Sequence, residues 1–388
     1  MNIIYEVAPK RIVAQLFVVL SACATACSPA PKGASDAGGV KGDMALVNGS
    51  QSDGASSEDA GAGTITFVAG TAVATLAGSE IAGSKEGIGD AAQFNNPTGI
   101  ALDGSGNLFV AEYDGARVRK VTKAGATSTI TSQKGFVEPF GVTFVSAEEL
   151  LVQTDDNNAG VKSASSGTLW NVPVGTGVAT MLVGGLGRPR GIAHLTANTV
   201  VVSDRTLQTI SLLDQANGTL TPLAGADGNN GYVDGNGASA RFDGPVGAAI
   251  LPDSSILVAD SNNHCLRQVT KEGTVSTFAG NGTKGMADGP RAAARFDRPV
   301  ALAIDSAGVV YISDQGDNHR IRRVTLKGDV ETVAGNGVAG FADGAGDLAE
   351  FYGQEGIAVD PDGKILYVAD GNSGDASMHH RIRKITLP

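Results

Sequence analysis

The chain has few of the residues that cross-link a fold or mark a common catalytic centre. Its 388 residues include three cysteines, one tryptophan and 5% aromatic residues. Three cysteines make no disulfide framework, and we expect Cys265 to be a small buried filler within a strand. Neither a Gly-x-Ser-x-Gly nor a His-Glu-x-x-His motif occurs, and no phosphate-binding loop is present. These absences exclude the most common hydrolase, metalloprotease and nucleotide-binding signatures.

Charged residues are also few, and acids outnumber bases. Asp plus Glu number 40 against 29 for Lys plus Arg, giving a formal charge of −11. Such a chain repels polyphosphate, so we expect no nucleic-acid partner. The 54 glycines follow no G-X-Y period, which excludes collagen, and a hydrophobic fraction of 42% excludes a disordered chain. The composition therefore predicts an acidic, turn-rich β protein.

The first residues have the pattern of a targeting signal. A basic segment ending in Lys10 and Arg11 precedes an apolar run, residues 12–22, that is too short for a membrane-spanning helix. Residues 20–23, Leu-Ser-Ala-Cys, resemble the bacterial lipobox, and the resemblance implies cleavage before Cys23 and lipidation of its thiol. Cys27 follows a poorer version of the motif. An ordinary secretory signal, with both cysteines incidental, is the alternative.

A lipoprotein signal has consequences for location. Residue 24 is Ala and not Asp, which under the enterobacterial sorting rule directs the protein to the outer membrane of a Gram-negative bacterium. Residues 28–63 are mostly Ser, Gly, Ala, Pro and Asp, and they cannot bury enough apolar surface to offset their chain entropy. We therefore expect a signal peptide at 1–22, a flexible tether at 23–63, and a lipid-anchored protein of the cell envelope.

A six-fold internal repeat occupies the rest of the chain. A Pro-x-Gly triplet or a close relative, followed by an alternating apolar run, recurs at intervals of 42, 50, 56, 54 and 55 residues. The copies begin at Pro97, Pro139, Pro189, Pro245, Pro299 and Gln354. Each copy contains short β-branched strands separated by Gly, Asp or Asn, as in 108–112 and 117–122. Four short antiparallel strands in each unit predict a β-propeller blade.

Two of the copies carry a recognisable signature. Residues 263–267, Asn-His-Cys-Leu-Arg, and residues 318–322, Asn-His-Arg-Ile-Arg, resemble the NHL repeat. The resemblance covers residues 64–388 and implies an all-β, six-bladed β-propeller of the NHL type. The copies that begin at Pro139 and Pro189 keep the strand rhythm but lose the signature.

The ends of the repeat predict how the ring closes. The last copy ends at Pro388 before any fourth strand, and residues 74–78, Ala-Thr-Leu-Ala-Gly, supply a strand of that kind. An N-terminal strand that completes the last blade closes the ring and removes an open sheet edge. We therefore expect one propeller domain, residues 64–388.

The connectors between blades are of two kinds. Four of them share a twelve-residue form that contains an acid-Gly pair and ends in Ala-x-Phe: 83–94, 231–242, 285–296 and 340–351. We expect the Ala and Phe to be buried between adjacent blades. The connectors before the second and third blades lack this form, so the sequence predicts an open arc above those two blades.

The open arc is the predicted binding surface. An aromatic group, two arginines and a histidine on an acidic protein favour an anionic or peptide ligand. The candidate residues are Phe140, Phe144, Trp170, Arg188, Arg190 and His194. The alternative is sequence drift in two blades under no constraint.

Metal and cofactor chemistry is not predicted. His264, His319 and His380 recur once per blade, on a circle too wide for one metal, and we expect them to hydrogen-bond the Asp that ends each second strand. We predict a non-enzymatic, lipid-anchored monomer that binds an envelope protein, a peptide or a small anionic ligand. Some six-bladed relatives are zinc lyases or calcium lactonases, and that resemblance implies the alternative: a metal-dependent extracytoplasmic lyase or lactonase.

Overall fold

The computed structural model describes residues 63–156, 163, 165–371 and 379–388. The chain divides into two units, Met1–Glu58 and Asp59–Pro388, and all these residues belong to the second. The predicted signal peptide, Cys23, Cys27 and nearly all of the predicted tether lie outside the described residues. No helix in the described part is long and apolar enough to cross a membrane.

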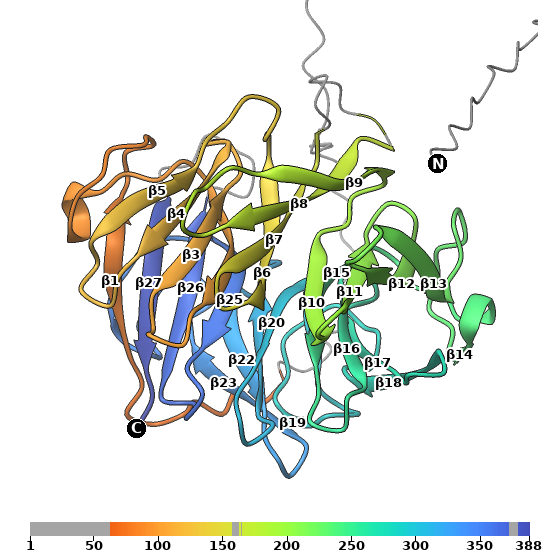
Figure 1. Cartoon of the computed structure of the whole chain (residues 1–388). Helices are drawn as coiled ribbons and strands as arrows, with labels where there is room; N and C mark the ends of the chain where they lie inside the picture. The colour runs from red at the N-terminus through yellow and green to blue at the C-terminus, as the bar shows by residue number, and fades with distance from the viewer. Residues whose placement is uncertain (1–62, 157–162, 164, 372–378) are drawn as a thin grey trace, which may run out of the picture. The chain divides into compact units, whose positions relative to one another are not determined.

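Six antiparallel sheets, one per repeat, surround a common axis (Figure 1). Blade 1 contains β2 (Pro97–Leu102), β3 (Leu108–Glu112), β4 (Arg117–Val121) and β5 (Thr127–Thr131); blade 2 contains β6 (Pro139–Ser146), β7 (Glu149–Thr154), β8 (Gly167–Pro173) and β9 (Thr180–Leu186). Blade 3 contains β10 (Gly191–Thr196), β11 (Thr199–Asp204), β12 (Thr209–Asp214) and β13 (Thr219–Gly225); blade 4 contains β15 (Pro245–Ile250), β16 (Ile256–Asp260), β17 (Cys265–Val269) and β18 (Thr274–Ala279). Blade 5 contains β20 (Pro299–Ile304), β21 (Val310–Asp314), β22 (Arg320–Val324) and β23 (Asp329–Ala334); blade 6 contains β25 (Gly353–Val359), β26 (Ile365–Gly371), β27 (His380–Thr386) and β1 (Ala72–Ser79).

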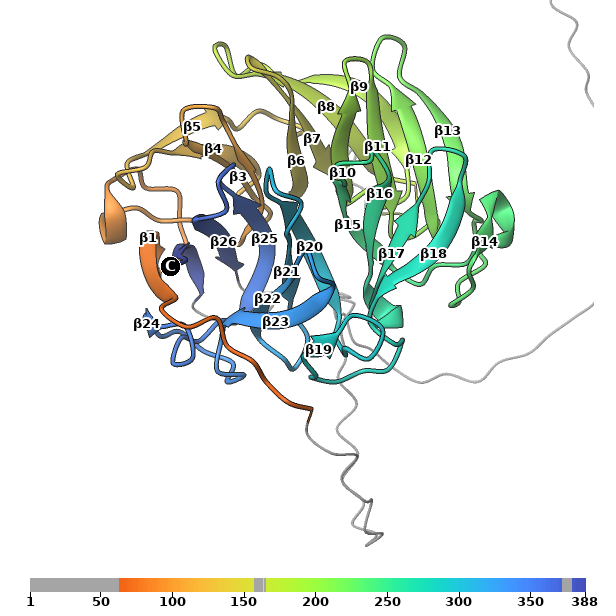
Figure 2. The ribbon, with the colours of Figure 1, turned by 90° about the horizontal axis from the view of Figure 1, so that it is seen from below.

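The first strand of each repeat is the innermost strand of its blade (Figure 2). These six strands contact one another in cyclic order from β2 to β25, and β25 in turn contacts β2. The ring is therefore closed, and the predicted all-β, six-bladed propeller is confirmed.

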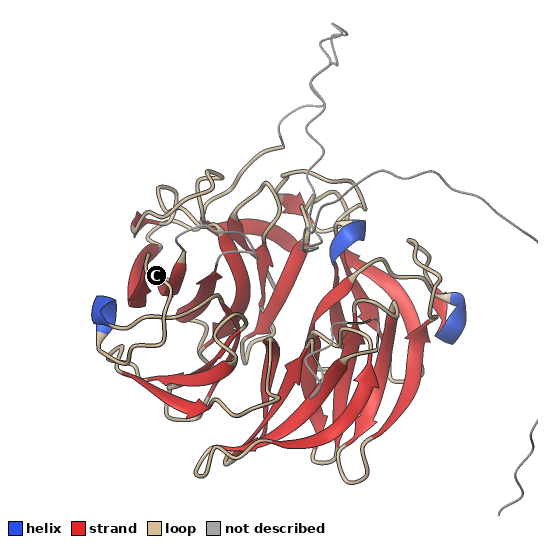
Figure 3. Ribbon diagram, turned by 90° about the horizontal axis from the view of Figure 1, so that it is seen from above, coloured by secondary structure: helices blue, strands red, loops and turns tan. Residues whose placement is uncertain are grey.

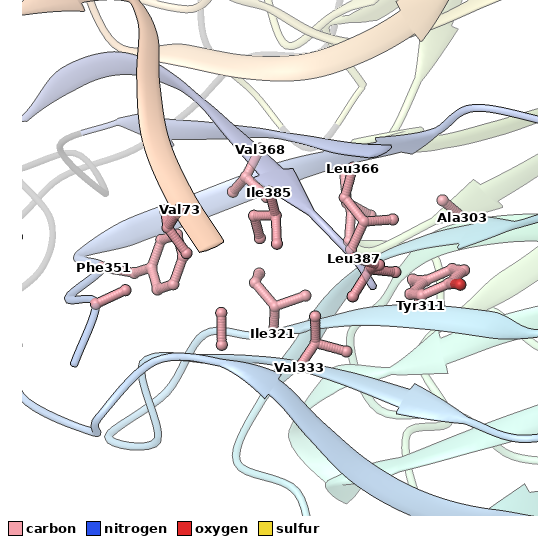
Figure 4. Packing of buried hydrophobic residues seen from close by; sticks show 13 residues of the cluster. Val73, Ala303, Tyr311, Ile321, Val333, Phe351, Leu366, Val368, Ile385 and Leu387 are labelled. Atoms are coloured by element: carbon pink, nitrogen blue, oxygen red, sulfur yellow. The ribbon is translucent and has the colours of Figure 1, made fainter. Parts of the chain in front are cut away.

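The two ends of the described unit meet in blade 6, as predicted. Strand β1 pairs antiparallel with β27, with Val73 opposite Ile385. Val73, Phe351 and Ile385 then pack in one core cluster with Ile321 of blade 5 (Figure 4). The N-terminal strand thus supplies both the missing ladder and part of the core between blades 5 and 6.

The long connectors follow the perimeter of the ring. Their short strands β14 (Gly235–Asn236), β19 (Gly289–Pro290) and β24 (Gly344–Ala345) pair with the outermost strands β18, β23 and β1. The 3-10 helices η1 (Gly89–Ala91) and η2 (Gly237–Ser239) belong to connectors, and η3 (Ser261–Asn263) follows β16 (Figure 3). Among the described residues, β5, β9 and β13 receive no such fifth strand, although the connector to blade 1 still forms a bridge between Ile88 and Ala126 beside β5. The two arcs therefore differ at the rim, because each connector bonds the backbone of the outer strand before turning inward.

The ends of these connectors are buried between blades, as predicted. The Ala and Phe of all four are 0% exposed: Ala92, Phe94, Ala240, Phe242, Ala294, Phe296, Ala349 and Phe351. Cys265 is likewise 0% exposed, and it forms no disulfide within the part of the chain that the structure describes. Each connector is therefore anchored in the core by the same two apolar side chains.

A buried arginine on the third strand of four blades was not predicted. Arg119, Arg267, Arg322 and Arg383 are each 0% exposed. In each case a guanidinium nitrogen lies 2.8 to 3.0 Å from the acid that ends the second strand, and the group lies 5.0 to 5.3 Å from the connector Phe ring. Ion pairing and stacking together offset the cost of burying the charge.

Candidate functional site

Six equivalent residues surround one mouth of the propeller axis. Each repeat begins with Pro or Gln, continues with a variable residue, and then has Gly or Ala. The variable residues are Thr98, Phe140, Arg190, Val246, Val300 and Glu355. A Cβ on Gly191, the next residue of blade 3, would lie 1.9 Å from the Val246 carbonyl oxygen of blade 4. Glycine therefore lets neighbouring backbones approach closely, and the strands converge on a narrow axial space.

A small cavity occupies this axial space. Its volume is about 80 Å³, and Arg190 and Glu355 border its mouth beside Phe140, Val246 and Val300, which pack together in a buried apolar cluster. Further along the innermost strands the lining is apolar, consisting of Ile100, Val142, Ile192, Ala248, Leu302 and Ile357. The cavity therefore has a mouth that is charged on one part and apolar on another, and a neck that is apolar throughout.

Arg190 is held rigidly at the mouth. Its side chain is 10% exposed, and its Nη2 lies 2.7 Å from Asp155 Oδ2. Its guanidinium stacks on the Phe140 ring, with the Cζ atom 4.2 Å from the ring centroid. Among the described residues, the buried Nε of Arg190 has no hydrogen-bond partner. The guanidinium is therefore a fixed cation at the edge of the cavity, held by one carboxylate and one aromatic ring.

Asp155 fixes the arginines on this side of the mouth. It is 2% exposed and accepts hydrogen bonds from Arg188 Nε at 2.9 Å and from the Tyr113 hydroxyl at 3.0 Å. Burial alone would raise its pKa, but the guanidinium groups of Arg190 and Arg188 hold the pKa well below the ordinary value. Asp155 therefore stays ionised, and one carboxylate serves two arginines.

Further charged groups complete the cluster. Burial raises the pKa of Glu355, whose Oε1 lies 3.4 Å from Gln315 Nε2, although Arg190, Arg205 and Arg298 oppose that shift. Burial, together with Arg190 and other arginines nearby, lowers the pKa of Arg205 to about 10. No hydrogen bond or ion pair joins the Arg205 guanidinium to another residue of the described part of the chain. Positive charge at the mouth is therefore incompletely neutralised.

The structure brings together three of the six predicted site residues. Phe140, Arg188 and Arg190 meet at the axial mouth. Phe144 and His194 occupy equivalent positions further along their innermost strands; Phe144 packs edge-on against Phe109 at 5.1 Å, and His194 is exposed. These two residues lie away from the mouth because they fall beyond the glycine where the strands converge.

Trp170 lies in the interior of blade 2. It is 3% exposed, its Nε1 donates to Thr154 Oγ1 at 2.9 Å, and its ring packs on Phe136 at 5.8 Å. In register, Trp170 and Thr154 take the places of the buried Arg and the acid of other blades. Blade 2 therefore replaces a buried ion pair by a neutral hydrogen bond, and Trp170 is a core residue.

Sequence reasoning missed four residues of the mouth: Tyr113, Asp155, Arg205 and Glu355. The first three directly follow the end of their second strands, and Glu355 follows Gln354, the first residue of the sixth repeat. Aligning these two positions across all six repeats would have found them, because equivalent residues surround the axis in a propeller.

The repeated histidines have a structural role between blades. His264 Nδ1 accepts from the Arg298 backbone N–H at 3.2 Å, and His380 Nδ1 accepts from the Asn96 N–H at 3.1 Å. The expected partner was the Asp that ends the second strand, but Asp260 instead accepts from Asn263 and Arg267. No group of three possible metal ligands occurs in the part of the chain that the structure describes.

The fold and its repeat define a class: a six-bladed β-propeller that contains an NHL repeat, whose family model matches residues 242–269. The chain is 26% identical over 283 residues to Protein SUPPRESSOR OF QUENCHING 1, chloroplastic, of Arabidopsis thaliana, covering 63% of this chain and 26% of that protein. It is 24% identical over 325 residues to human NHL repeat-containing protein 2, covering 79% of this chain and 41% of that protein. The chain thus spans about a quarter to two fifths of these relatives.

Solved structures show the same fold. A protein of Bacteroides thetaiotaomicron described as an auxiliary nutrient binding protein has a TM-score of 0.63 and 20% identity, covering 81% of this chain and 76% of that one. A structure described as streptogramin B lyase has a TM-score of 0.51 and 13% identity, covering 82% of this chain and 98% of that one. At these identities the likeness concerns the fold alone.

Proposed function

We propose that this chain is a non-enzymatic, lipid-anchored envelope protein whose propeller binds a small anionic ligand at the axial mouth. The observation that carries the proposal is the fixed positive cluster there. Arg190 is nine-tenths buried and paired with Asp155, and Arg205 has no partner for its guanidinium in the described part of the chain. An anion beside Arg205 would compensate the positive charge that the nearby acids leave unneutralised.

The geometry favours a small anion over a peptide or a protein. Two of the charged groups, Arg190 and Glu355, border a cavity of about 80 Å³, which is too small for a folded partner to enter. Charge-assisted hydrogen bonds in such a partly dehydrated site are stronger than the same bonds at a surface. The stacking of Arg190 on Phe140 also reduces the ordering cost of binding. The Bacteroides protein described as nutrient-binding supports a binding role, with the fold as the link.

The envelope location rests on the sequence. Cys23 would receive the lipid after cleavage of residues 1–22, and residues 23–63 would tether the propeller to the membrane. We propose the outer membrane of a Gram-negative bacterium as the site of anchoring, with the lipid as the only membrane contact. We propose a monomer that binds no nucleic acid.

Calorimetric titration of the full-length protein with acetate, inorganic phosphate and sulfate tests the ligand class. Arg205→Gln removes an unpaired charge and should weaken binding at least tenfold. Arg291→Gln is the matched control, because Arg291 lies in the connector beside β19 at the perimeter. Absence of binding by any anion, or equal loss in both variants, would overturn the axial site. Elemental analysis that finds about one zinc or calcium per chain would instead favour the lyase or lactonase alternative.

A further inference from the structure

The apolar neck beneath the charged mouth restricts what the anion is attached to. Six aliphatic side chains, one from each blade, line it: Ile100, Val142, Ile192, Ala248, Leu302 and Ile357. None of them offers a hydrogen bond. A phosphate or sulfate ion, which is polar on every side, would leave this neck without a complementary group. A ligand that fills the whole cavity therefore has one charged end and one apolar end.

The size of the cavity limits the length of the ligand. At roughly 10–15 Å³ for each water-sized group, about 80 Å³ holds roughly five to eight non-hydrogen atoms. A carboxylate uses three of these atoms, which leaves room for a chain of a few carbons. Peptides, saccharides and long-chain fatty acids exceed this volume.

The charges at the mouth favour a simple carboxylate over a zwitterion. The Arg205 guanidinium has no partner in the described part of the chain, and Arg190, which borders the cavity, lies near it. Glu355, on the far side, accepts a hydrogen bond from Gln315 at 3.4 Å, and three arginines lie near it: Arg190, Arg205 and Arg298. Asp155 accepts hydrogen bonds from Tyr113 and from Arg188. A ligand ammonium would therefore approach Glu355 through a field dominated by arginines.

We infer that the ligand is a short-chain aliphatic monocarboxylate, with its carboxylate on Arg190 and Arg205 and its alkyl chain in the neck. The inference rests on the proposed anion-binding function and adds the class of ligand. Each methylene that enters the neck should tighten binding about fourfold until the cavity is full. The geometry therefore predicts a rising and then falling affinity along a homologous series.

The test is calorimetric titration of the full-length protein with acetate, propionate, butyrate and octanoate, beside inorganic phosphate and alanine. Butyrate should bind at least tenfold more tightly than acetate. Octanoate should bind more weakly than butyrate, because its chain exceeds the neck. Affinity that does not change with chain length, or phosphate that binds as tightly as butyrate, would overturn the inference and leave the anion site in place. If none of the anions binds, the proposed function fails as well.

Two variants separate the neck from the mouth. Ala248→Val narrows the neck and should weaken the binding of butyrate more than the binding of acetate. An equal effect on both would contradict the placement of the alkyl chain in the neck. Glu355→Gln removes a negative charge from the mouth and should increase the affinity for propionate several-fold. If alanine binds tightly and Glu355→Gln abolishes that binding, the ligand is a zwitterion and the monocarboxylate class is wrong.

Discussion

Replacing Arg119 by methionine measures what the buried arginine of a blade contributes. Arg119 and Glu112 are both 0% exposed, and Nη1 lies 3.0 Å from Oε1. The guanidinium also donates to the Gln93 carbonyl at 3.1 Å and lies 5.3 Å from the Phe94 ring. Methionine retains an unbranched apolar chain but leaves Glu112 buried without its counter-charge. Breaking a buried pair in this way costs about 3–5 kcal/mol, so we expect the free energy of unfolding to fall by that amount at about pH 8.

The loss should depend on pH. Burial raises the pKa of Glu112 from 4.5 to about 7, with Arg119 opposing the shift. The pKa of Glu112 is thus higher in the folded state than in the unfolded state. The stabilisation that comes from binding this proton is complete below the pKa of the unfolded state, and it is lost as the pH rises through the pKa of the folded state. Removal of Arg119 raises the folded pKa further. The variant should therefore lose much less stability at about pH 5, where Glu112 is protonated, than at about pH 8.

Urea unfolding followed by tryptophan fluorescence reports both values, because Trp170 is the sole tryptophan and is 3% exposed. Arg117→Met is the control: Arg117 lies on the same strand, is 23% exposed and approaches Glu112 only to 4.0 Å. Its loss should stay below about 1 kcal/mol. A similarly small loss for Arg119→Met at alkaline pH, or equal losses at both pH values, would refute the argument from buried charge.

Three further predictions concern packing, ring closure and anchoring. Phe296→Ala should lower the free energy of unfolding by about 3–5 kcal/mol, measured in urea, because Phe296 is 0% exposed between blades. Gly191→Ala should lower the melting temperature by several degrees, since its Cβ would meet the Val246 carbonyl, while Gly104→Ala, with no atom within 4 Å, should leave it unchanged. Cys23→Ser should abolish incorporation of radiolabelled palmitate in cells, and retained label would contradict the lipoprotein assignment.

Most of the fold was predictable because a propeller is built from local patterns repeated in sequence. The strand positions, the turns and the six repeats follow from alternating apolar residues and from the Gly, Asp and Asn residues between the strands of each copy. Residues 74–78 resemble the other fourth strands, and this resemblance predicted the closing strand. The burial of Phe296 and its equivalents followed from their recurrence, since repeated residues serve repeated packing.

The residues by themselves thus determined the architecture, and they also supplied Phe140, Arg188 and Arg190 as candidates. The tertiary structure decided which side chains share a site. Arg190 and Glu355 come from blades 3 and 6, and only closure of the ring places them around the same cavity. The sequence predicted Trp170 as a ligand contact, but the strand register places it where other blades have a buried arginine. The reason is physical: periodicity fixes which way a strand side chain points, but its neighbours across the axis depend on the order of blades in the ring.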